Sequence, residues 1–345
     1  MIKIPIIQPI GMFYIGKMSA LEILNHTVIQ RRSEGKGVQR ALKLDRVKKI
    51  SKYCTDPDAT FPTSIIISVE ESKVKIVDDR ELCFKEGEII WNIIDGQHRL
   101  EGLKESNIAK EFELPVIFMV DLQREEEAYV FSVINSNQVK VPPSVVYDLF
   151  GIYETASPQK TAHQIARGLN SDSSSPFYQR LKMLGKKQQG IESLSQGTFI
   201  VYLLRLISRE PDSDAIDIKN KKTLLDDERF PLRGYFIKGK DEVIYKIIKN
   251  YFSAVKNVFK EQWETPKDYI LTKTTGYAAL ITAFPEIYKS GKKEKNLSEE
   301  YFTNIFLNVK NHFDNNEIRF TSKQFPSNSQ GVKQLSDEIL RGIRW

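Results

Sequence analysis

The stretch Glu88-Ile89-Ile90-Trp91-Asn92-Ile93-Ile94-Asp95-Gly96-Gln97-His98-Arg99-Leu100-Glu101 joins an apolar run to a compact polar cluster. The apolar run predicts a strand, and residues 100–107 predict a helix. Backbone N–H groups at the start of a helix are unpaired, and the helix dipole favours negative charge there. The sequence therefore predicts an anion-binding turn at residues 95–99, which we call the signature turn.

The signature turn carries four chemically different side chains, those of Asp95, Gln97, His98 and Arg99. In the functional interpretation, Arg99 holds a phosphate through its planar guanidinium, and Gln97 and His98 add donors. Gly96 lets the backbone approach the ligand closely, and Asp95 positions Mg²⁺ or the attacking water. In the structural alternative, Asp95 caps the helix and Arg99 pairs with a neighbouring acid. That alternative explains Gln97 and His98 poorly, so we expect a functional site.

Length and composition place the chain among ordinary globular proteins. Its 345 residues are enough for two domains, and 41% hydrophobic with 28% charged residues argue against a disordered or membrane protein. No apolar run reaches roughly 18 residues, and we expect no signal peptide. Cys54 and Cys83 are too few for a disulfide framework and lack metal-ligand spacing, so we expect a cytoplasmic protein. The net charge of +6 and the pI of about 9.0 permit nucleic-acid binding without showing it.

The character of the sequence changes at about residue 150. The first part predicts strands at residues 12–16, 64–69, 73–77 and 115–120, and helices at residues 19–30, 44–54 and 125–134. The second part predicts helices at residues 198–208, 243–259, 276–288 and 298–313. We therefore expect an α+β fold, with a mixed α/β domain at residues 1–150 and a mainly helical domain at residues 151–345.

A second glycine-containing stretch, residues 11–18, resembles a phosphate loop only superficially. The pattern requires Ser or Thr where Met18 stands, because that hydroxyl binds Mg²⁺. The residues between Gly11 and Gly16 are bulky and apolar, which predicts a strand that runs into a helix. The signature turn is therefore the better candidate for a nucleotide site.

Basic residues gather on the helix expected at residues 44–54. The faces beside its apolar stripe carry Arg46, Lys48, Lys49 and Lys52. We expect these side chains to contact DNA phosphates, and the alternative is a solvated helix face. Arg40 lies between a glycine-rich turn and this helix, so we expect it to be a second contact for the nucleotide phosphates.

Two further segments are candidates for smaller roles. Asn135, at the start of the polar residues 135–138, borders the site as a donor in one interpretation and forms part of a C-capping loop in the other. Residues 272–276 predict the start of a helix, with Thr275 as its N-cap. His26 and His163 have no companions at metal-ligand spacing.

Residues 94–100, Ile-Asp-Gly-Gln-His-Arg-Leu, resemble the signature of the DGQHR-domain family, which includes the DndB-type proteins of DNA phosphorothioation clusters and the DpdB-type proteins of deazaguanine DNA-modification clusters. Weaker matches lie at Gly37-Val38-Gln39-Arg40, Arg46-Val47-Lys48-Lys49-Ile50, Phe61-Pro62-Thr63-Ser64-Ile65, Phe131-Ser132-Val133-Ile134-Asn135, and Thr274-Thr275-Gly276-Tyr277 with Leu280. The resemblance therefore covers most of the chain.

The resemblance implies an N-terminal domain related to ParB and sulfiredoxin, in which the equivalent turn binds nucleotide phosphates. Sulfiredoxin-like proteins carry a nucleophilic cysteine in that turn, whereas Gln97 stands here, which argues against sulfinic-acid repair. Related proteins of phage-restriction systems hydrolyse nucleotides with a similar motif. The resemblance thus implies ATP and Mg²⁺ as candidate cofactors, and DNA and DNA-modification proteins of the same gene cluster as partners.

Three functional hypotheses follow. The first is a nucleotide-binding and ATP-hydrolysing accessory protein of a bacterial DNA-modification or defence system, with Asp95, His98 and Arg99 as its catalytic residues. The second is a non-catalytic DNA-binding regulator of the modification genes, although no helix-turn-helix stands out in the sequence. The third is an assembly partner of a modification enzyme, and a homo-oligomer stays open in all three.

Overall fold

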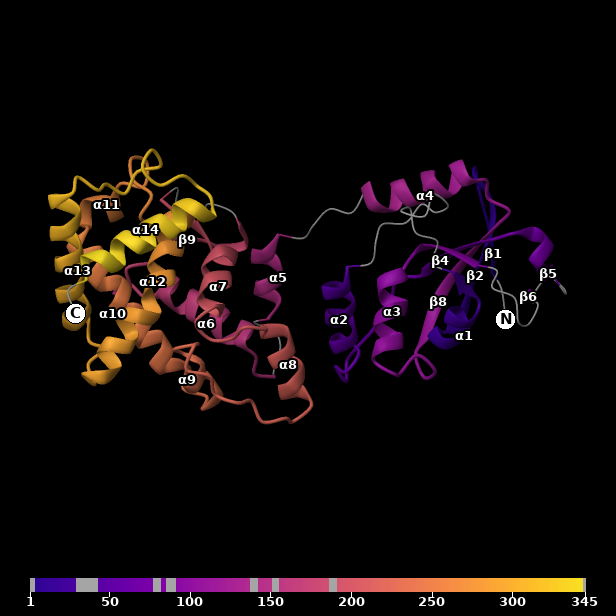
Figure 1. Cartoon of the computed structure of the whole chain (residues 1–345), viewed down its shortest axis with the longest axis horizontal. Coiled ribbons are helices and arrows are strands. Elements are labelled where there is room, and N and C mark those ends of the chain that lie inside the picture. Colours follow the sequence, from indigo (N-terminus) through magenta and orange to yellow (C-terminus); the bar gives the residue numbers. More distant parts are fainter. Residues whose placement is uncertain are drawn as a thin grey trace. The chain divides into compact units, whose positions relative to one another are not determined.

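The computed structural model describes residues 4–28, 43–76, 82–84, 91–136, 142–150, 155–185 and 191–343. Its contacts separate two compact units, Met1–Lys140 and Val141–Trp345, which we call the N-terminal and C-terminal units (Figure 1). The expected fold class, a mixed α/β part followed by a mainly helical part, is confirmed. The domain boundary expected at residue 150 stays a prediction. A domain is a unit that folds on its own, and a division by contacts does not show independent folding.

A mixed sheet forms the centre of the described part of the N-terminal unit, with the strand order β1-β2-β8-β4-β7-β3. These strands are β1 (Ile4–Gln8), β2 (Gly11–Ser19), β3 (Thr27–Val28), β4 (Ile65–Val69), β7 (Trp91–Asp95) and β8 (Glu113–Val120). The central strand β4 runs parallel to β8 and antiparallel to β7. A separate antiparallel pair is formed by β5 (Val74–Ile76) and β6 (Leu82–Phe84).

Both faces of the sheet are covered, because side chains alternate along each strand. Ile65 and Ile67 of β4 belong to one buried cluster, whereas Ile66 between them packs with a second cluster. The first face is covered by α1 (Ala20–Asn25) and α3 (Gln97–Glu105), with α2 (Leu44–Tyr53) beside α3, and the second by α4 (Arg124–Ser136) (Figure 1). The uninterrupted apolar runs of the sequence therefore form the strands β4, β7 and β8, which are covered on both faces, whereas the edge strand β1 is largely exposed.

The N-terminal unit also shows where the sequence-based elements were right and wrong. The phosphate-loop-like stretch is the strand β2, which runs into α1 as expected. Ser19 caps α1 in a reciprocal capping box with Glu22. The helix expected to continue to residue 30 ends at Asn25, because Thr27 pairs with Trp91 of β7 in a parallel ladder.

The C-terminal unit is mainly helical around one large buried cluster. Its helices are α5 (Pro143–Leu149), α6 (Pro158–Ser171), α7 (Gln196–Leu204), α8 (Pro211–Lys219), α9 (Arg233–Ile237), α10 (Asp241–Val258), α11 (Lys260–Glu264), α12 (Thr274–Lys293), α13 (Glu299–Asn315) and α14 (Ser329–Gly342). A short parallel pair, β9 (Leu181–Lys182) and β10 (Leu194–Ser195), accompanies them. The N-cap of α12 is Lys273, so the expectation of a Thr275 cap was wrong.

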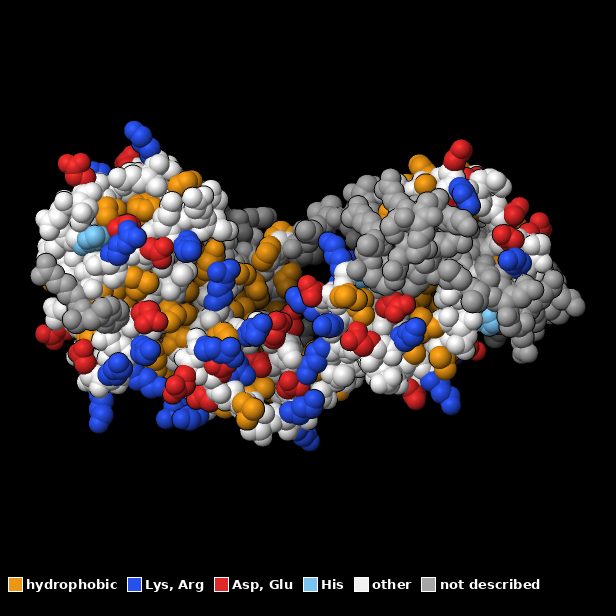
Figure 2. All heavy atoms as spheres, viewed as in Figure 1, with side chains coloured by type: hydrophobic (Ala, Val, Ile, Leu, Met, Phe, Trp, Pro, Cys, Tyr) orange, Lys and Arg blue, Asp and Glu red, His pale blue; other side chains and the backbone are white. Residues whose placement is uncertain are grey.

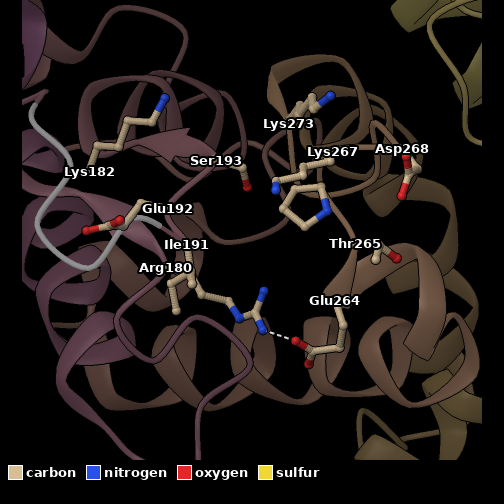
Figure 3. A pocket seen from close by; sticks show the side chains of 11 residues that line it. Arg180, Lys182, Ile191, Glu192, Ser193, Glu264, Thr265, Lys267, Asp268 and Lys273 are labelled. Carbon is tan, nitrogen blue, oxygen red and sulfur yellow. Dashed lines mark hydrogen bonds and ion pairs between the residues drawn. The ribbon is translucent and has the colours of Figure 1, made fainter.

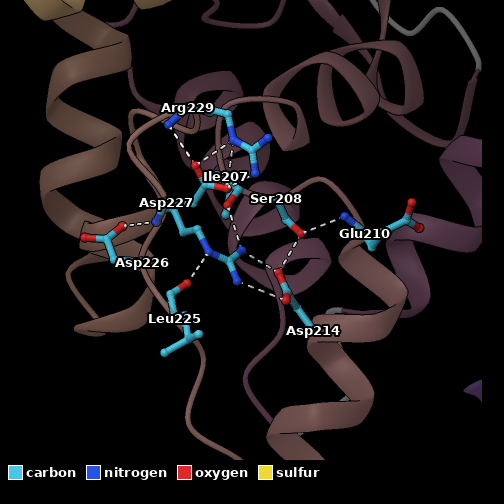
Figure 4. A network of polar contacts seen from close by, with 9 residues as sticks. Ile207, Ser208, Glu210, Asp214, Leu225, Asp226, Asp227 and Arg229 are labelled. Atoms are coloured by element: carbon cyan, nitrogen blue, oxygen red, sulfur yellow. Dashed lines mark hydrogen bonds and ion pairs between the residues drawn. The ribbon is translucent and has the colours of Figure 1, made fainter.

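A buried ion pair fixes the loop between α8 and α9. Arg233 donates to both carboxylate oxygens of Asp214, at 2.6 and 3.1 Å, and to the carbonyl oxygens of Leu225 and Ile207. Ser208 donates to the same carboxylate at 2.5 Å (Figure 4). Since both charged side chains are almost fully buried, the pair depends on these additional hydrogen bonds to offset its desolvation.

Candidate functional site

The second residue of the signature turn is a glycine that no other residue could replace without strain. Gly96 is the N-cap of α3 and has φ 106° and ψ 3°, a left-handed conformation. A Cβ built there would lie 2.4 Å from Cδ1 of Ile65 in β4. The chain therefore leaves β7 and enters α3 at the closest possible distance from β4. No side chain caps α3, so the expectation in the structural alternative that Asp95 caps it was wrong.

Arg99 connects the signature turn to the residues that precede β4. Its Nη1 donates to the hydroxyl of Thr63 at 2.7 Å and also to the Thr63 carbonyl, while its Nη2 donates to the Ser64 carbonyl at 3.0 Å. Nη2 also donates to Oδ2 of Asp95 at 2.8 Å, an ion pair in which the Arg99 side chain is only 14% exposed. Both terminal nitrogens thus have two acceptors each within the protein, as many as they have N–H groups.

His98 connects α3 to α2. Its Nε2 accepts a hydrogen bond from the backbone N–H of Lys43, the N-cap of α2, at 3.3 Å. Nε2 is therefore the unprotonated nitrogen of the ring. Burial lowers the pKa of His98, and the charges of Arg46 and Lys43 lower it further against the opposing effect of Asp95. Both effects keep the imidazole neutral at neutral pH.

The helices α2 and α3 lie side by side and point in the same direction (Figure 1). At the start of the two helices, His98 accepts the hydrogen bond from Lys43. In the middle they pack so closely that a Cβ on Gly102 would lie 2.3 Å from Cγ2 of Ile50. At their ends, the side chains of Cys54 and Ser106 form a hydrogen bond. Burial raises the pKa of the Cys54 thiol, so it stays protonated. The N-termini of both helices therefore lie next to one another, and the positive ends of their dipoles act on the same space.

Arg46 adds a positive charge at this shared end. It is exposed in the first turn of α2, and its charge lowers the pKa of both His98 and Arg99, although burial contributes more to each shift. The structure thus brings Arg46, expected to be a DNA contact, to the signature turn. Lys48 and Lys49 are exposed further along α2, and Lys52 is half-buried in its last turn.

The structure does not describe two of the expected site side chains. Arg40 lies outside the described residues. Asn135 lies in the last turn of α4, which reaches Ser136, and its side chain also lies outside the description. The expectation that residues 135–138 form a loop was therefore wrong for the first two. Gln97 is in the first turn of α3 and is buried, with 8% of its surface exposed.

The signature turn offers a metal ion one carboxylate, that of Asp95, which is already paired with Arg99. Within the described ranges, no three His, Cys, Asp or Glu residues are grouped as a metal site requires. Mg²⁺ bound with a nucleotide commonly uses one or two carboxylates together with the phosphates. The residues present therefore do not form a metal site of their own.

Sequence reasoning missed Thr63, Ser64 and Lys43, whose backbone groups fix the side chains of Arg99 and His98. Backbone partners leave no pattern in the sequence, because any residue supplies a carbonyl and almost any an N–H group. The available signal was the position of residues 61–65 directly before a buried strand.

The face of the protein drawn in Figure 2 carries no large patch of charges of a single sign. Figure 2 shows Lys and Arg side chains interspersed with Asp and Glu across it. The net charge of +6 thus does not by itself mark a DNA-binding face, and local groups of cations must be considered instead. Among the helices of the described residues, none combines the length and the apolar character needed to cross a bilayer.

Comparisons with known proteins identify a family and a similar solved structure. A family model, DndB, described as DNA-sulfur modification-associated, matches residues 6–205. No curated protein matches the chain. The crystal structure of the C-terminally truncated chromosome-partitioning protein ParB from Caulobacter crescentus, complexed with CTP-gamma-S, matches with a TM-score of 0.28 and 10% identity, over 65% of this chain and 98% of that chain. At this score the similarity supports no conclusion about fold, ligand or function.

Proposed function

The chain belongs to the DndB family of DNA-sulfur modification-associated proteins, and from this premise we propose that it is an accessory protein of a bacterial DNA-modification system that binds a nucleotide and DNA. Residues 95–99 serve as its DGQHR signature. Its partners are DNA and modification proteins of the same gene cluster. Its place of action is the cytoplasm, because a DNA-modification system works where the DNA is.

The observation that carries the nucleotide-binding proposal is the meeting of the N-termini of α2 and α3. Two helix starts direct N–H groups and positive dipole ends into one space, and Arg46 adds a full positive charge. A nucleotide's phosphates are the ligand chemistry that fits this arrangement. ATP is the nucleotide we propose, and Arg40 and Asn135 remain proposed contacts.

The side chains of the turn have different roles in this proposal. Gly96 lets the chain turn from β7 into α3 directly beside Ile65, and the backbone N–H of His98 in the first turn of α3 binds a phosphate. The guanidinium of Arg99 already has protein partners, so Arg99 positions the turn against β4. His98 likewise positions α2 against α3 through Lys43.

In addition to nucleotide binding, the proposal includes slow hydrolysis of ATP. Asp95, with 34% of its side chain exposed, is the group that would orient the attacking water or a Mg²⁺ that arrives on the phosphates. His98 and Arg99 would support this step by fixing the turn rather than by transferring a proton.

DNA binding is proposed for the outer face of α2. Lys48 and Lys49 are exposed there, and Lys52 follows one turn after Lys48. Exposed cations along one helix contact phosphates without reading the sequence, and such binding weakens as salt increases.

The terminal nitrogens of Arg99 already donate to acceptors within the protein. This favours a second candidate function, a non-catalytic DNA-binding regulator of the modification genes. In that case the signature turn senses a ligand or only stabilises the fold. A regulator binds its operator more tightly than random DNA, and it turns over no nucleotide.

One experiment on the purified full chain separates these functions. Binding and hydrolysis of ATP, CTP and GTP are measured with and without DNA, for the wild type and for Arg46→Ala, with Lys110→Ala as a control because Lys110 is equally exposed in the same unit. We expect Arg46→Ala to weaken nucleotide binding by about tenfold, consistent with one lost charge-assisted contact, and the control to bind as the wild type does. Wild-type protein that binds none of the nucleotides would contradict the proposal, and operator-selective DNA binding without nucleotide would establish the regulator.

A further inference from the structure

A hollow of about 780 Å³ opens in the C-terminal unit where two long helices begin. It is lined by the first residues of α12, Lys273 and Thr274, and by those of α14, Asn328 and Ser329. The remaining lining residues are mainly polar or basic: Ser193, Tyr202, Arg205, Thr275, Thr282, Ser327, Val332 and Lys333. The hollow therefore combines hydroxyl groups with cations, and no Asp or Glu of the described residues lines it.

Three cations from three different helices or helix starts converge on this hollow: Arg205 after α7, Lys273 before α12 and Lys333 in α14. No carboxylate of the described residues lies within 4.0 Å of any of their charged nitrogens. The Arg205 guanidinium lies 4.2 Å from the centre of the Tyr202 ring, which orients it without neutralising it. Three unneutralised positive charges thus face a common space.

The two helix starts at the hollow are held by the same device. The third residue of α12 is Gly276, and a Cβ there would lie 2.4 Å from the Ile270 carbonyl oxygen. The third residue of α14 is Gly331, and a Cβ there would lie 2.0 Å from the Pro326 carbonyl oxygen. In both places the preceding chain folds closely over the first helical turn. Each N-terminus is therefore fixed in position while its outer side faces the hollow.

A second hollow, of about 650 Å³, adjoins the first, since Ser193 and Lys273 line both. It adds Lys182 and Lys267, which have no carboxylate partner within 4.0 Å among the described residues, and Arg180, which pairs with Glu264 (Figure 3). Glu192 and Asp268 also line this second hollow, so its charges are mixed, and the excess of positive charge lies at the first hollow. The two hollows together form a groove, which we call the α12 groove. Cations without a carboxylate partner among the described residues lie in both hollows, which suits an extended polyanion better than a single small anion.

We propose that the α12 groove binds the phosphodiester backbone of a DNA strand. The inference rests on the DNA binding of the proposed function and assigns it a second site, in the C-terminal unit and separate from the signature turn. A small anion would need one cation and one helix N-terminus, whereas the groove presents cations along two adjoining hollows. Hydroxyl groups and helix N-termini supply the hydrogen bonds that phosphate oxygens accept.

The test uses the full chain with Arg205→Ala, Lys273→Ala and Lys333→Ala combined, and a control of equal charge with Lys246→Ala, Lys260→Ala and Lys310→Ala combined. The control lysines are exposed on other helices of the same unit. Anisotropy of a labelled oligonucleotide is measured across salt concentrations, with folding checked by circular dichroism. We expect the groove variant to bind at least tenfold more weakly and its log–log salt slope to fall by about 2, since each phosphate contact contributes roughly 0.7 to 0.9. Affinity and slope equal to those of the control would overturn the proposal.

Two further measurements identify the ligand and separate this site from the signature turn. Inorganic pyrophosphate that stabilises the wild type, while oligonucleotides do not bind, would show a small-anion pocket and contradict the assignment to DNA. Nucleotide binding at the signature turn is expected to be unchanged in the groove variant. Wild-type protein that binds nucleotide but no DNA would thus overturn the groove and leave the nucleotide proposal standing. A variant with Lys273→Arg alone keeps the charge and is expected to bind DNA as the wild type does.

Discussion

Nε2 of His98 accepts the backbone N–H of Lys43 at 3.3 Å, a contact between residues 55 positions apart that joins the starts of α2 and α3. It requires the neutral imidazole, because a protonated ring has no acceptor nitrogen. The geometry of the shared helix end therefore depends on the protonation state of one histidine.

We predict that the N-terminal unit loses stability as the pH falls below about 6.5, the ordinary pKa of histidine. Burial, Arg46 and Lys43 lower the pKa of His98 in the folded protein, so the unfolded chain binds more protons between the two pKa values. The contribution of His98 to stability is therefore complete above its pKa in the unfolded chain. It is lost as the pH falls toward its pKa in the folded protein. Urea unfolding of wild type and His98→Gln between pH 5 and 8 measures it, and equal pH dependence would contradict the prediction.

Replacing Arg99 with alanine should lower the free energy of unfolding by about 2 kcal/mol, because the Asp95 carboxylate and two backbone carbonyls lose their donors. The exposure of Asp95 to solvent limits the effect. Arg99→Lys should recover part of it, since lysine keeps the charge but cannot reach Thr63, Ser64 and Asp95 together. Denaturant unfolding of both variants is the measurement, and equal stability of Arg99→Lys and wild type would show that charge alone matters.

Gly96→Ala should destabilise the protein by about 1 to 3 kcal/mol, from the left-handed backbone and the contact of the new Cβ with Cδ1 of Ile65. Ile65→Val removes that Cδ1 atom. We expect the double variant to be less destabilised than the sum of the two single changes. A double-mutant cycle by thermal or urea unfolding measures this coupling, and strict additivity would mean that the backbone strain is the whole effect.

Gly102→Ala should weaken nucleotide binding although Gly102 lies a turn away from the helix starts. Its Cβ would lie 2.3 Å from Cγ2 of Ile50 and would move α2 away from α3. Titration with a fluorescent nucleotide detects the loss. Gly168→Ala in the C-terminal unit, where the nearest atom is the edge of the Tyr245 ring at 3.0 Å, serves as the control with normal binding.

Arg233→Ala should destabilise the C-terminal unit by about 3 to 5 kcal/mol, because it leaves the buried Asp214 carboxylate without its partner. The further change Asp214→Asn removes that charge and should restore part of the stability. Calorimetric unfolding of the single and double variants measures the difference. A single variant as stable as the wild type would show that the pair contributes little.

The sequence predicted the central strands of the sheet, because buried strands appear as continuous apolar runs, but it did not predict β1 or β3. Residues 64–69 and 115–120 were expected as strands, and the structure has Ile65–Val69 and Glu113–Val120. It did not predict α6, whose polar side chains are buried and bonded to distant residues. Gln159 donates to Asp212, and Thr161 to Asp241. Tertiary partners of this kind satisfy polar groups that read locally as surface.

The same limit applies to the signature turn. Its glycine and its position between a strand and a helix could be predicted from residues 94–100, and so could the pairing of Arg99 with a neighbouring acid, which the structure shows to be Asp95. Partners of Arg99 lie 35 and 36 residues away in the sequence, and their hydrogen bonds are the reason why we propose a positioning role for Arg99 in place of phosphate binding. Arg46 likewise acts on the turn because α2 packs against α3. The periodicity of a single helix does not predict which other helix it packs against.

The parallel packing of α2 and α3 has a thermodynamic consequence for the ligand-free protein. Two helices that point the same way place like poles next to one another, and the charge of Arg46 adds to the repulsion at that end. An anion between the poles converts this repulsion into attraction. The ligand-free N-terminal unit should therefore be the less stable form, and multivalent anions should raise its melting temperature more than chloride does at equal ionic strength.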